Sequence, residues 1–307
     1  MSDIKVLGHT PADTDTVCSP IVYAWYLKNV KGQDAEAVIG SELNKETKVA
    51  LEEFGVAVPE QVSQVEAGSK VVLIDTTNPK ELISGVTEAE IIEVLDHHKL
   101  GGLATDKPLN VTIRPYGCVA TVVYERMGAD TAELPKEMAG LLAAAIISDT
   151  LNLTSPTTTE VDKEALAKLT DLAGVKADEL AEKMFTAKSD ISDMTAEQVL
   201  GMDCKDFDFG GSNYRISSIE TTNPQFTLDR IEEFRKSAEE IKVASSLVGV
   251  FVFVVDILKS EATLFCTAGS EELAQKAFKA EFVNGLMHLP GVVSRKKQIV
   301  PAFEDAV

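Results

Sequence analysis

The sequence predicts an α/β protein whose N-terminal domain is a parallel β-sheet with helices on both faces, followed by a smaller α/β domain with a mixed sheet. In the first half of the 307-residue chain, short apolar runs alternate with helical stretches, as in parallel sheets joined by crossover helices. Runs rich in Val and Ile are typical of buried parallel strands. Three such runs, 4–8, 71–74 and 91–95, stop directly at a His or an Asp. Because ligands of open α/β sheets bind beyond the carboxyl ends of the strands, we expect a metal site at this edge.

The elements of the first domain follow from local patterns. Gly32 ends the first helix, and Thr16 or Ser19 is its expected N-cap. Asn78 and Pro79 open a short helix, since proline is favoured in the first helical turn. The expected strands span 4–8, 35–39, 71–75, 91–95 and 110–114, and the expected helices span 16–31, 44–54, 118–127 and 135–147.

The second half begins with a helical pattern over 160–187 that Gly174 interrupts. Residues 188–193 are polar and poor in helix formers, which favours a linker. We therefore expect a first domain over 1–189, a hinge over 190–194 and a second domain over 195–307. Beyond the linker, the expected strands span 204–209, 214–219, 247–256 and 262–267, with helices over 228–241 and 271–278.

The composition limits the classes of partner. A net charge of -20 disfavours binding to nucleic-acid backbones and to anionic membrane surfaces. The four cysteines are far apart and form no CxxC pair, which argues against a disulfide framework or a structural zinc site. The chain begins without a signal-peptide pattern, and its longest apolar run, 247–255, is too short to cross a bilayer. We expect a soluble, cytoplasmic protein.

The first candidate ligands follow the first strand. His9, Asp13 and Asp15 lie within seven residues on one loop, so they can reach one or two divalent cations. The alternative is that one aspartate caps the next helix and His9 is a surface imidazole, since Asp is common at helix starts.

Further candidates lie at later strand and helix ends. Asp75 follows an apolar strand, although a cap or turn before Pro79 explains a single Asp equally well. Asp96, His97 and His98 are more specific, because the chain has only four histidines and two are adjacent here. Asp149 ends an apolar stretch, where an Asp is usually a capping residue. Together these carboxylates and imidazoles suit Mn²⁺, Mg²⁺ or Co²⁺, and one carboxylate bridging two cations would give a site that activates water.

One dense basic cluster stands out in this acidic chain. It covers residues 291–298 and contains Arg295 and Lys296, which suit phosphate oxygens. The alternative is a solvated turn beside acidic neighbours. Lys205, on an alternating strand, is equally well explained as a solvent-facing side chain.

In motif order, spacing and length, the whole chain resembles the DHH phosphoesterase superfamily, and specifically the family II, manganese-dependent soluble inorganic pyrophosphatases. The triplet at 96–98 indicates the superfamily, and the SRKKQ motif at 294–298 indicates the pyrophosphatases. One departure is visible: the family has Pro immediately before its first Asp, whereas here Ala12 separates Pro11 from Asp13.

The resemblance implies hydrolysis of pyrophosphate to two phosphates by a hydroxide that two metals activate, in a cleft between a DHH catalytic domain and a DHHA2-like substrate-binding domain. It implies two Mn²⁺ per subunit, which Co²⁺ or Mg²⁺ can replace, additional Mg²⁺ with the substrate, and a homodimer paired through the N-terminal domain. Asp96 would orient the histidines from behind. The implied ligands are His9, Asp13 and Asp75 for one metal and Asp15, Asp75, His97 and Asp149 for the other, and the implied substrate-binding and catalytic groups are His98, Lys205, Ser294, Arg295 and Lys296.

Two other functions stay open at this point. A related phosphohydrolase would act on short polyphosphate or a nucleoside bisphosphate, but no aromatic residue flanks the SRKKQ motif to stack on a base. A non-catalytic sensor would bind metal and phosphate without hydrolysis.

Overall fold

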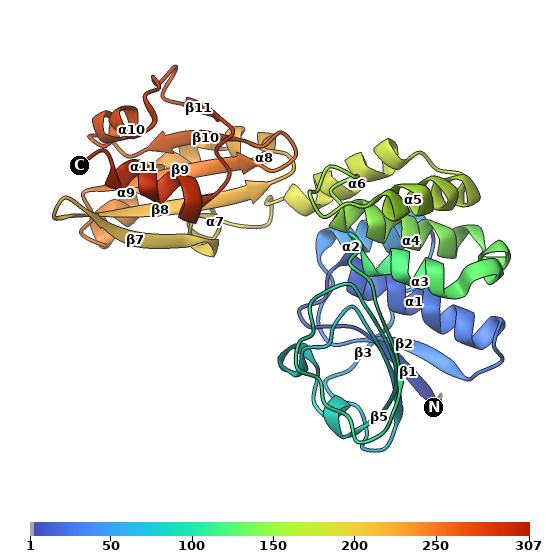
Figure 1. The fold of residues 1–307 in the computed structure, drawn as a ribbon. Helices are drawn as coiled ribbons and strands as arrows, with labels where there is room; N and C mark the ends of the chain where they lie inside the picture. The colour runs from blue at the N-terminus through green and yellow to red at the C-terminus, as the bar shows by residue number, and fades with distance from the viewer. Residues whose placement is uncertain (1–2) are drawn as a thin grey trace. The chain divides into compact units, whose positions relative to one another are not determined.

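The computed structural model describes residues 3–307, which form two compact units that divide between Ala187 and Lys188 (Figure 1). Each unit has its own sheet and core. The predicted hinge over 190–194 follows the last helix of the first unit, α6 (Ala177–Ser189), so Lys188 and Ser189 of the expected linker are helical.

The first unit contains a six-stranded, fully parallel sheet in the order β3-β2-β1-β4-β5-β6. This confirms the predicted parallel α/β fold. β3 was not predicted, because its two residues carry no periodic pattern. The strands are β1 (Ile4–Leu7), β2 (Ala35–Ile39), β3 (Glu60–Gln61), β4 (Lys70–Ile74), β5 (Glu90–Asp96) and β6 (Asn110–Ile113).

The α-helices of this unit gather in layers beside the sheet (Figure 1). Of these helices, α1 and α3 make the larger contacts with strands, while α4 packs on α1 and α5. Leu7, Val71, Leu73 and Val94 pack instead with segments that carry the short 3-10 helices η1 (Pro79–Glu81) and η2 (Val86–Glu88). Besides η1, η2 and α6, the helices of this unit and their bounds are α1 (Thr14–Asn29), α2 (Lys45–Glu53), α3 (Val119–Met127), η3 (Gly128–Glu133), α4 (Lys136–Asp149) and α5 (Glu160–Ala173).

The expected N-cap of the first helix was wrong. α1 starts at Thr14, and Asp13 is its N-cap, because the Asp13 carboxylate accepts the backbone N–H of Thr16 at 2.9 Å. The Thr16 hydroxyl accepts the N–H of His9 instead, and the Ser19 hydroxyl donates to Asp15. Both expected caps are therefore used to shape the loop that carries the first candidate ligands.

The second unit contains a five-stranded mixed sheet in the order β11-β10-β9-β8-β7, as the sequence predicted. Only β8 and β9 pair in parallel. The strands are β7 (Cys204–Phe209), β8 (Ser212–Thr221), β9 (Gly249–Asp256), β10 (Glu261–Cys266) and β11 (Met287–Pro290).

Helices cover both faces of this sheet. One core forms with α7 and α9, and a second core forms around Phe303 at the end of the chain. Short elements that lack a long apolar period were not predicted: α7, α8, β11 and the C-terminal helices. The helices are α7 (Ala196–Met202), α8 (Gln225–Leu228), α9 (Ile231–Ala244), α10 (Glu271–Phe278), the π-helix η4 (Arg295–Ile299) and α11 (Val300–Glu304).

Candidate metal centre

The loop after β1 brings three candidate ligands to the carboxyl edge of the sheet. Gly8 is required there, because a Cβ at this position would lie 1.8 Å from the Thr16 hydroxyl and 2.8 Å from the Ile74 carbonyl oxygen. This close approach leaves room for the His9 N–H to donate to the Thr16 hydroxyl, and Asp13 and Asp15 follow at the start of α1.

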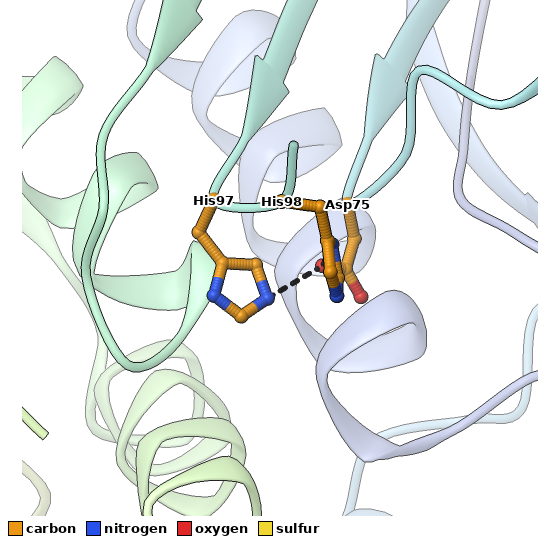
Figure 2. A group of neighbouring side chains, drawn as sticks. All are labelled: Asp75, His97 and His98. Carbon is orange, nitrogen blue, oxygen red and sulfur yellow. Dashed lines mark ion pairs between the residues drawn. The ribbon is translucent and has the colours of Figure 1, made fainter. Parts of the chain in front are cut away.

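Asp75 lies in the middle of the site and is buried. It follows β4 with φ +73, a left-handed conformation that Asp adopts more readily than most residues. Its two carboxylate oxygens face different histidines. Oδ2 is 3.3 Å from Nε2 of His9. Oδ1 is 3.2 Å from Nε2 of His97 (Figure 2).

Backbone carbonyls fix the orientation of both imidazoles. Nδ1 of His9 lies 2.8 Å from the carbonyl oxygen of Pro11, and Nδ1 of His97 lies 3.0 Å from that of Tyr116. A carbonyl only accepts, so each Nδ1 is the donor, and each Nε2 is the nitrogen directed into the site. Such outer partners commonly orient histidines that bind metal.

Within residues 3–307, three groups of potential ligand atoms share this arrangement. One consists of Asp75, His97 and His98, with Nδ1 of His98 3.5 Å from Oδ1 of Asp75, and the other two have no residue in common. In the first of these two, His9, Asp13 and Asp75 converge, with Nε2 of His9 3.4 Å from Oδ2 of Asp13. In the second, Asp15, His97 and Asp149 converge, with Nε2 of His97 3.6 Å from Oδ2 of Asp149. Within each group the ligand atoms lie within 4.8 Å of one another. Because Asp75 faces His97 as well as His9, its carboxylate lies between the two groups.

Asp15 is held from several directions. Its Oδ1 accepts the Ser19 hydroxyl at 2.6 Å, and its Oδ2 accepts the N–H of Val119 at 2.7 Å and the thiol of Cys118 at 3.0 Å. Asp149 is the last residue of α4, which reaches two residues further than predicted. The packing of α4 on α1 therefore brings Asp149 to the site.

His98 differs from the other two histidines. Its Nδ1 lies 3.1 Å from Oδ1 of Asp96, which also accepts the N–H groups of His97 and His98. The His98 side chain is 54% exposed, against 11% for His97, and it lines a cavity of about 310 Å³ together with His9 and Lys99. Asp96 lies behind the histidines.

The charges of the site are unbalanced without cations. Burial lowers the pKa of His9, but the carboxylates of Asp13 and Asp75 outweigh burial and raise it to about 11. Burial likewise lowers the pKa of His97, while Asp75 and Asp15 raise it to about 9. Burial and the charge of Asp75 raise the pKa of Asp15 to about 6, and burial with the charge of Asp15 raises that of Asp149. All four shifts favour the protonated form, so the carboxylates and histidines of this site together favour the binding of positive charge.

Two buried atoms support a metal site directly. Oδ1 of Asp75 and Nε2 of His97 are buried and face each other at 3.2 Å, but within residues 3–307 neither atom makes a hydrogen bond. Leaving both unpaired is costly unless a further group binds there. Carboxylate oxygens with imidazole nitrogens are a suitable donor set for Mn²⁺, so the residues present fit this cation.

The predicted phosphate-binding residues lie in the second unit. Arg295 begins η4, and its Nη1 donates to the carbonyl oxygen and the carboxylate of Asp203, at 3.0 and 2.7 Å. Ser294 is the N-cap of η4 and accepts the N–H of Lys297. Lys205 is exposed on β7, and Lys296 is exposed on η4.

Several groups that shape the site were not predicted from the sequence. They are the carbonyls of Pro11 and Tyr116, the N–H of Val119 and the Cys118 thiol. Three of these are backbone groups, which residue identity does not reveal. Ser19 was predicted only as a cap.

Comparison with known proteins defines the class. Residues 3–146 match the DHH family, N-terminal domain, and residues 182–306 match the DHHA2 domain. The two sheets and the carboxylate–histidine centre are thus those of a DHH-superfamily protein with a DHHA2 domain.

The relatives are more specific. Two curated relatives carry the name manganese-dependent inorganic pyrophosphatase: one of Lactobacillus gasseri is 36% identical, and one of Bacillus licheniformis is 37% identical, each over 100% of this chain and 99% of its own. A solved structure described as a family II inorganic pyrophosphatase of Methanococcus jannaschii is 33% identical, covers 99% of both chains and has a TM-score of 0.63. The chain belongs to the family II, manganese-dependent inorganic pyrophosphatases.

None of the helices in residues 3–307 has the length and apolar character that crossing a bilayer requires.

Proposed function

We propose that this protein hydrolyses inorganic pyrophosphate to two phosphates at the centre formed by the two ligand groups. The observation that carries the proposal is the Asp75 carboxylate, whose oxygens face Nε2 of His9 and Nε2 of His97 at 3.3 and 3.2 Å. A carboxylate in this position can bridge two cations, the arrangement that supports displacement at phosphorus. The names of the relatives supply the substrate class.

Two Mn²⁺ per subunit are proposed. His9, Asp13 and Asp75 would hold the first, and Asp15, Asp75, His97 and Asp149 the second. Bound there, the cations supply Lewis acidity that acidifies water and draws charge from the phosphoryl oxygens. Co²⁺ or Mg²⁺ would replace them, because the donor set is oxygen and imidazole, and further Mg²⁺ would accompany the substrate.

The residues of the chain bind and orient the substrate. His98 is suited to donate from Nε2 to a phosphate oxygen, since its Nδ1 is engaged by Asp96, which raises the pKa of His98. In the second unit, Asp203 contacts Arg295 through Nη1. Within residues 3–307, Nε and Nη2 of the guanidinium make no other ion pair or hydrogen bond, which leaves them for a bidentate contact with phosphate. Lys205, Ser294 and Lys296 complete the proposed set.

The decisive experiment measures phosphate release from pyrophosphate, triphosphate, ATP and a 3′,5′-nucleoside bisphosphate, after chelation and after readdition of Mn²⁺ or Mg²⁺. We expect Mn²⁺-dependent release from pyrophosphate alone. His97→Gln should abolish most of this activity, whereas His288→Gln, the same change at an exposed position of β11, should leave it intact. Preference for the bisphosphate or for longer chains would overturn the substrate. Saturable binding without release would instead indicate a sensor.

A homodimer paired through the N-terminal domain and a cytoplasmic location are part of the same proposal. β6 is an edge strand of the first sheet, and its Val111 is 53% exposed. An unpaired edge with an apolar side chain favours pairing with a second copy. Sedimentation equilibrium tests the dimer, and Val111→Lys, at the centre of the edge, should shift it toward monomer.

A further inference from the structure

A buried carboxylate outside the two ligand groups is hydrogen-bonded to a segment that contacts side chains of the second group. Asp162, in the first turn of α5, has no exposed surface. Its Oδ2 accepts the N–H of Gly117 at 2.9 Å and the N–H and hydroxyl of Thr159 at 2.8 and 2.7 Å, while its Oδ1 accepts the Thr121 hydroxyl at 2.6 Å. A buried carboxylate with this many donors is strongly fixed, so it can fix the groups that donate to it.

Residues 116–119 lie between Asp162 and the site, and we call them the 116–119 segment. On one side, Gly117 donates its N–H to Asp162. On the other side, the Tyr116 carbonyl accepts Nδ1–H of His97, and Val119 N–H and the Cys118 thiol donate to Oδ2 of Asp15. One short stretch of backbone therefore contacts two side chains of the second ligand group.

We propose that Asp162 is a positioning residue for the second metal group. This inference rests on the proposed function, because it takes Asp15, His97 and Asp149 as metal ligands. The hydrogen bond to Gly117 sets where the Tyr116 carbonyl and the Val119 N–H lie, and these set the directions of the His97 imidazole and the Asp15 carboxylate. Outer partners of metal ligands affect affinity substantially, and an effect relayed through one peptide group is expected at the low end, about tenfold.

The effect of Asp162 is selective, which separates it from a general role in folding. In the first group, His9 is oriented by the Pro11 carbonyl and Asp13 by the Thr16 N–H. These two orienting groups lie in the loop after β1 and in α1, outside the 116–119 segment, whereas Asp75 is shared by both metal groups. Loss of Asp162 should therefore weaken the second metal and leave the first nearly unchanged.

The test measures Mn²⁺ binding by equilibrium dialysis, with the free cation counted by its EPR signal, in two single-site backgrounds. His9→Gln removes a ligand of the first group only, and Asp149→Asn removes a ligand of the second group only. Asp162→Ala in the His9→Gln background should weaken Mn²⁺ binding about tenfold. The same change in the Asp149→Asn background should leave binding within about twofold of that background.

Thr159→Ala is the matched structural control. It removes a second hydrogen bond to Oδ2 of Asp162 and the N-cap side chain of α5, but it retains the bond from Gly117. It should lower thermal stability without changing Mn²⁺ affinity in either background. Asp162→Asn should restore most of the affinity, because the amide oxygen still accepts the Gly117 N–H.

If Asp162→Ala does not fold, Gly117→Ala perturbs the same contact from the other side. The added Cβ would lie 3.1 Å from Oδ2 of Asp162 and 2.8 Å from Cγ2 of Thr150, so the segment must move. Two outcomes would overturn this inference but not the proposed function. One is an equal loss of Mn²⁺ affinity in both backgrounds. The other is that Asp162→Ala and Gly117→Ala lose no more Mn²⁺ affinity than Thr159→Ala does. Absence of Mn²⁺ binding to the unaltered protein would overturn the proposed function as well.

Discussion

Removing the metal should make the stability of the first unit fall as the pH rises. In the metal-free chain, neighbouring carboxylates raise the pKa of His9 to about 11 and that of His97 to about 9, against burial, from an ordinary value of 6.5. Because each folded-state pKa lies above the unfolded value, each histidine stabilises the fold fully below pH 6.5, and this stabilisation is lost as the pH rises toward the folded-state value.

The size of the effect follows from the number of protons retained. Each pH unit over which the folded chain holds one extra proton corresponds to about 1.4 kcal/mol. Between pH 6.5 and about pH 8.5, each histidine therefore loses on the order of 2 kcal/mol, or about 4 kcal/mol for the pair. For a domain of this size, about 1 kcal/mol shifts Tm by roughly 2–4 °C, so a decline of roughly 8–16 °C is expected.

Bound Mn²⁺ should reverse the direction in which the stability of the first unit changes with pH. A cation at Nε2 requires the neutral imidazole, which places the folded-state pKa below 6.5, so stability is then lost as the pH falls. Differential scanning calorimetry with EDTA or with excess MnCl₂ measures both slopes. In EDTA, His97→Gln should remove about half of the decline, and His288→Gln none of it. A flat or rising EDTA profile, or an unchanged slope in His97→Gln, would refute this reasoning.

Two further predictions concern single contacts. Gly8→Ala should destabilise the first unit by about 1–3 kcal/mol and weaken Mn²⁺ binding, because its Cβ would lie 1.8 Å from the Thr16 hydroxyl. Gly201→Ala is the control, since nothing lies within 4 Å of a Cβ there. Equal midpoints of chemical denaturation for the two variants would contradict the prediction. Asp203→Asn should raise KM for pyrophosphate with little change in Mn²⁺ affinity, since Arg295 loses its ionic partner. Asp206→Asn removes a comparable pair, between Asp206 of β7 and Arg215 of β8, and should leave KM unchanged. A KM shift of the same size there would show that the effect is not specific to Arg295.

Much of the fold was predictable because its elements have strong local patterns. β2, β7 and α10 have the predicted bounds, and the fully buried β9 gives the long apolar run. α7 was missed although its sequence contains the evidence: Thr195 and Gln198 form a capping box. β3 could not have been predicted, because it has only two residues and both are exposed. Their pairing with β2 depends on the tertiary path of the chain after α2.

The candidate site shows a different limit. Strand ends meet at one edge in any parallel sheet, so the sequence places His9, Asp75 and His97 near one another. From the sequence, the roles of helix cap and metal ligand were alternatives for Asp13. In the structure both roles are compatible, because Oδ1 caps α1 while Oδ2 faces His9. Which backbone carbonyl orients each imidazole depends on tertiary packing, which no residue pattern reports.

The proposed function gives a role to the one dense basic segment of this acidic chain. The carboxylates of Asp13, Asp15, Asp75 and Asp149 carry four negative charges when ionised, and two divalent cations cancel these charges without a surplus. The centre with two cations bound then no longer repels a pyrophosphate anion, but it also does not neutralise the charge of that anion. In the proposed function this charge is balanced by the Mg²⁺ that accompanies the substrate and by the basic residues of η4.

Lys296 and its neighbour test this argument. Both lysines are exposed on η4, and successive positions of a helix point in different directions. Lys296→Gln should lower kcat/KM for pyrophosphate by at least about tenfold, the equivalent of about 1.4 kcal/mol of transition-state stabilisation, with an unchanged Mn²⁺ isotherm. Lys297→Gln removes the same charge one residue away and should retain near-normal turnover. If both variants lose activity equally, the basic segment acts through its overall field; if neither does, the anion is neutralised elsewhere, and the second unit contributes less to catalysis than proposed.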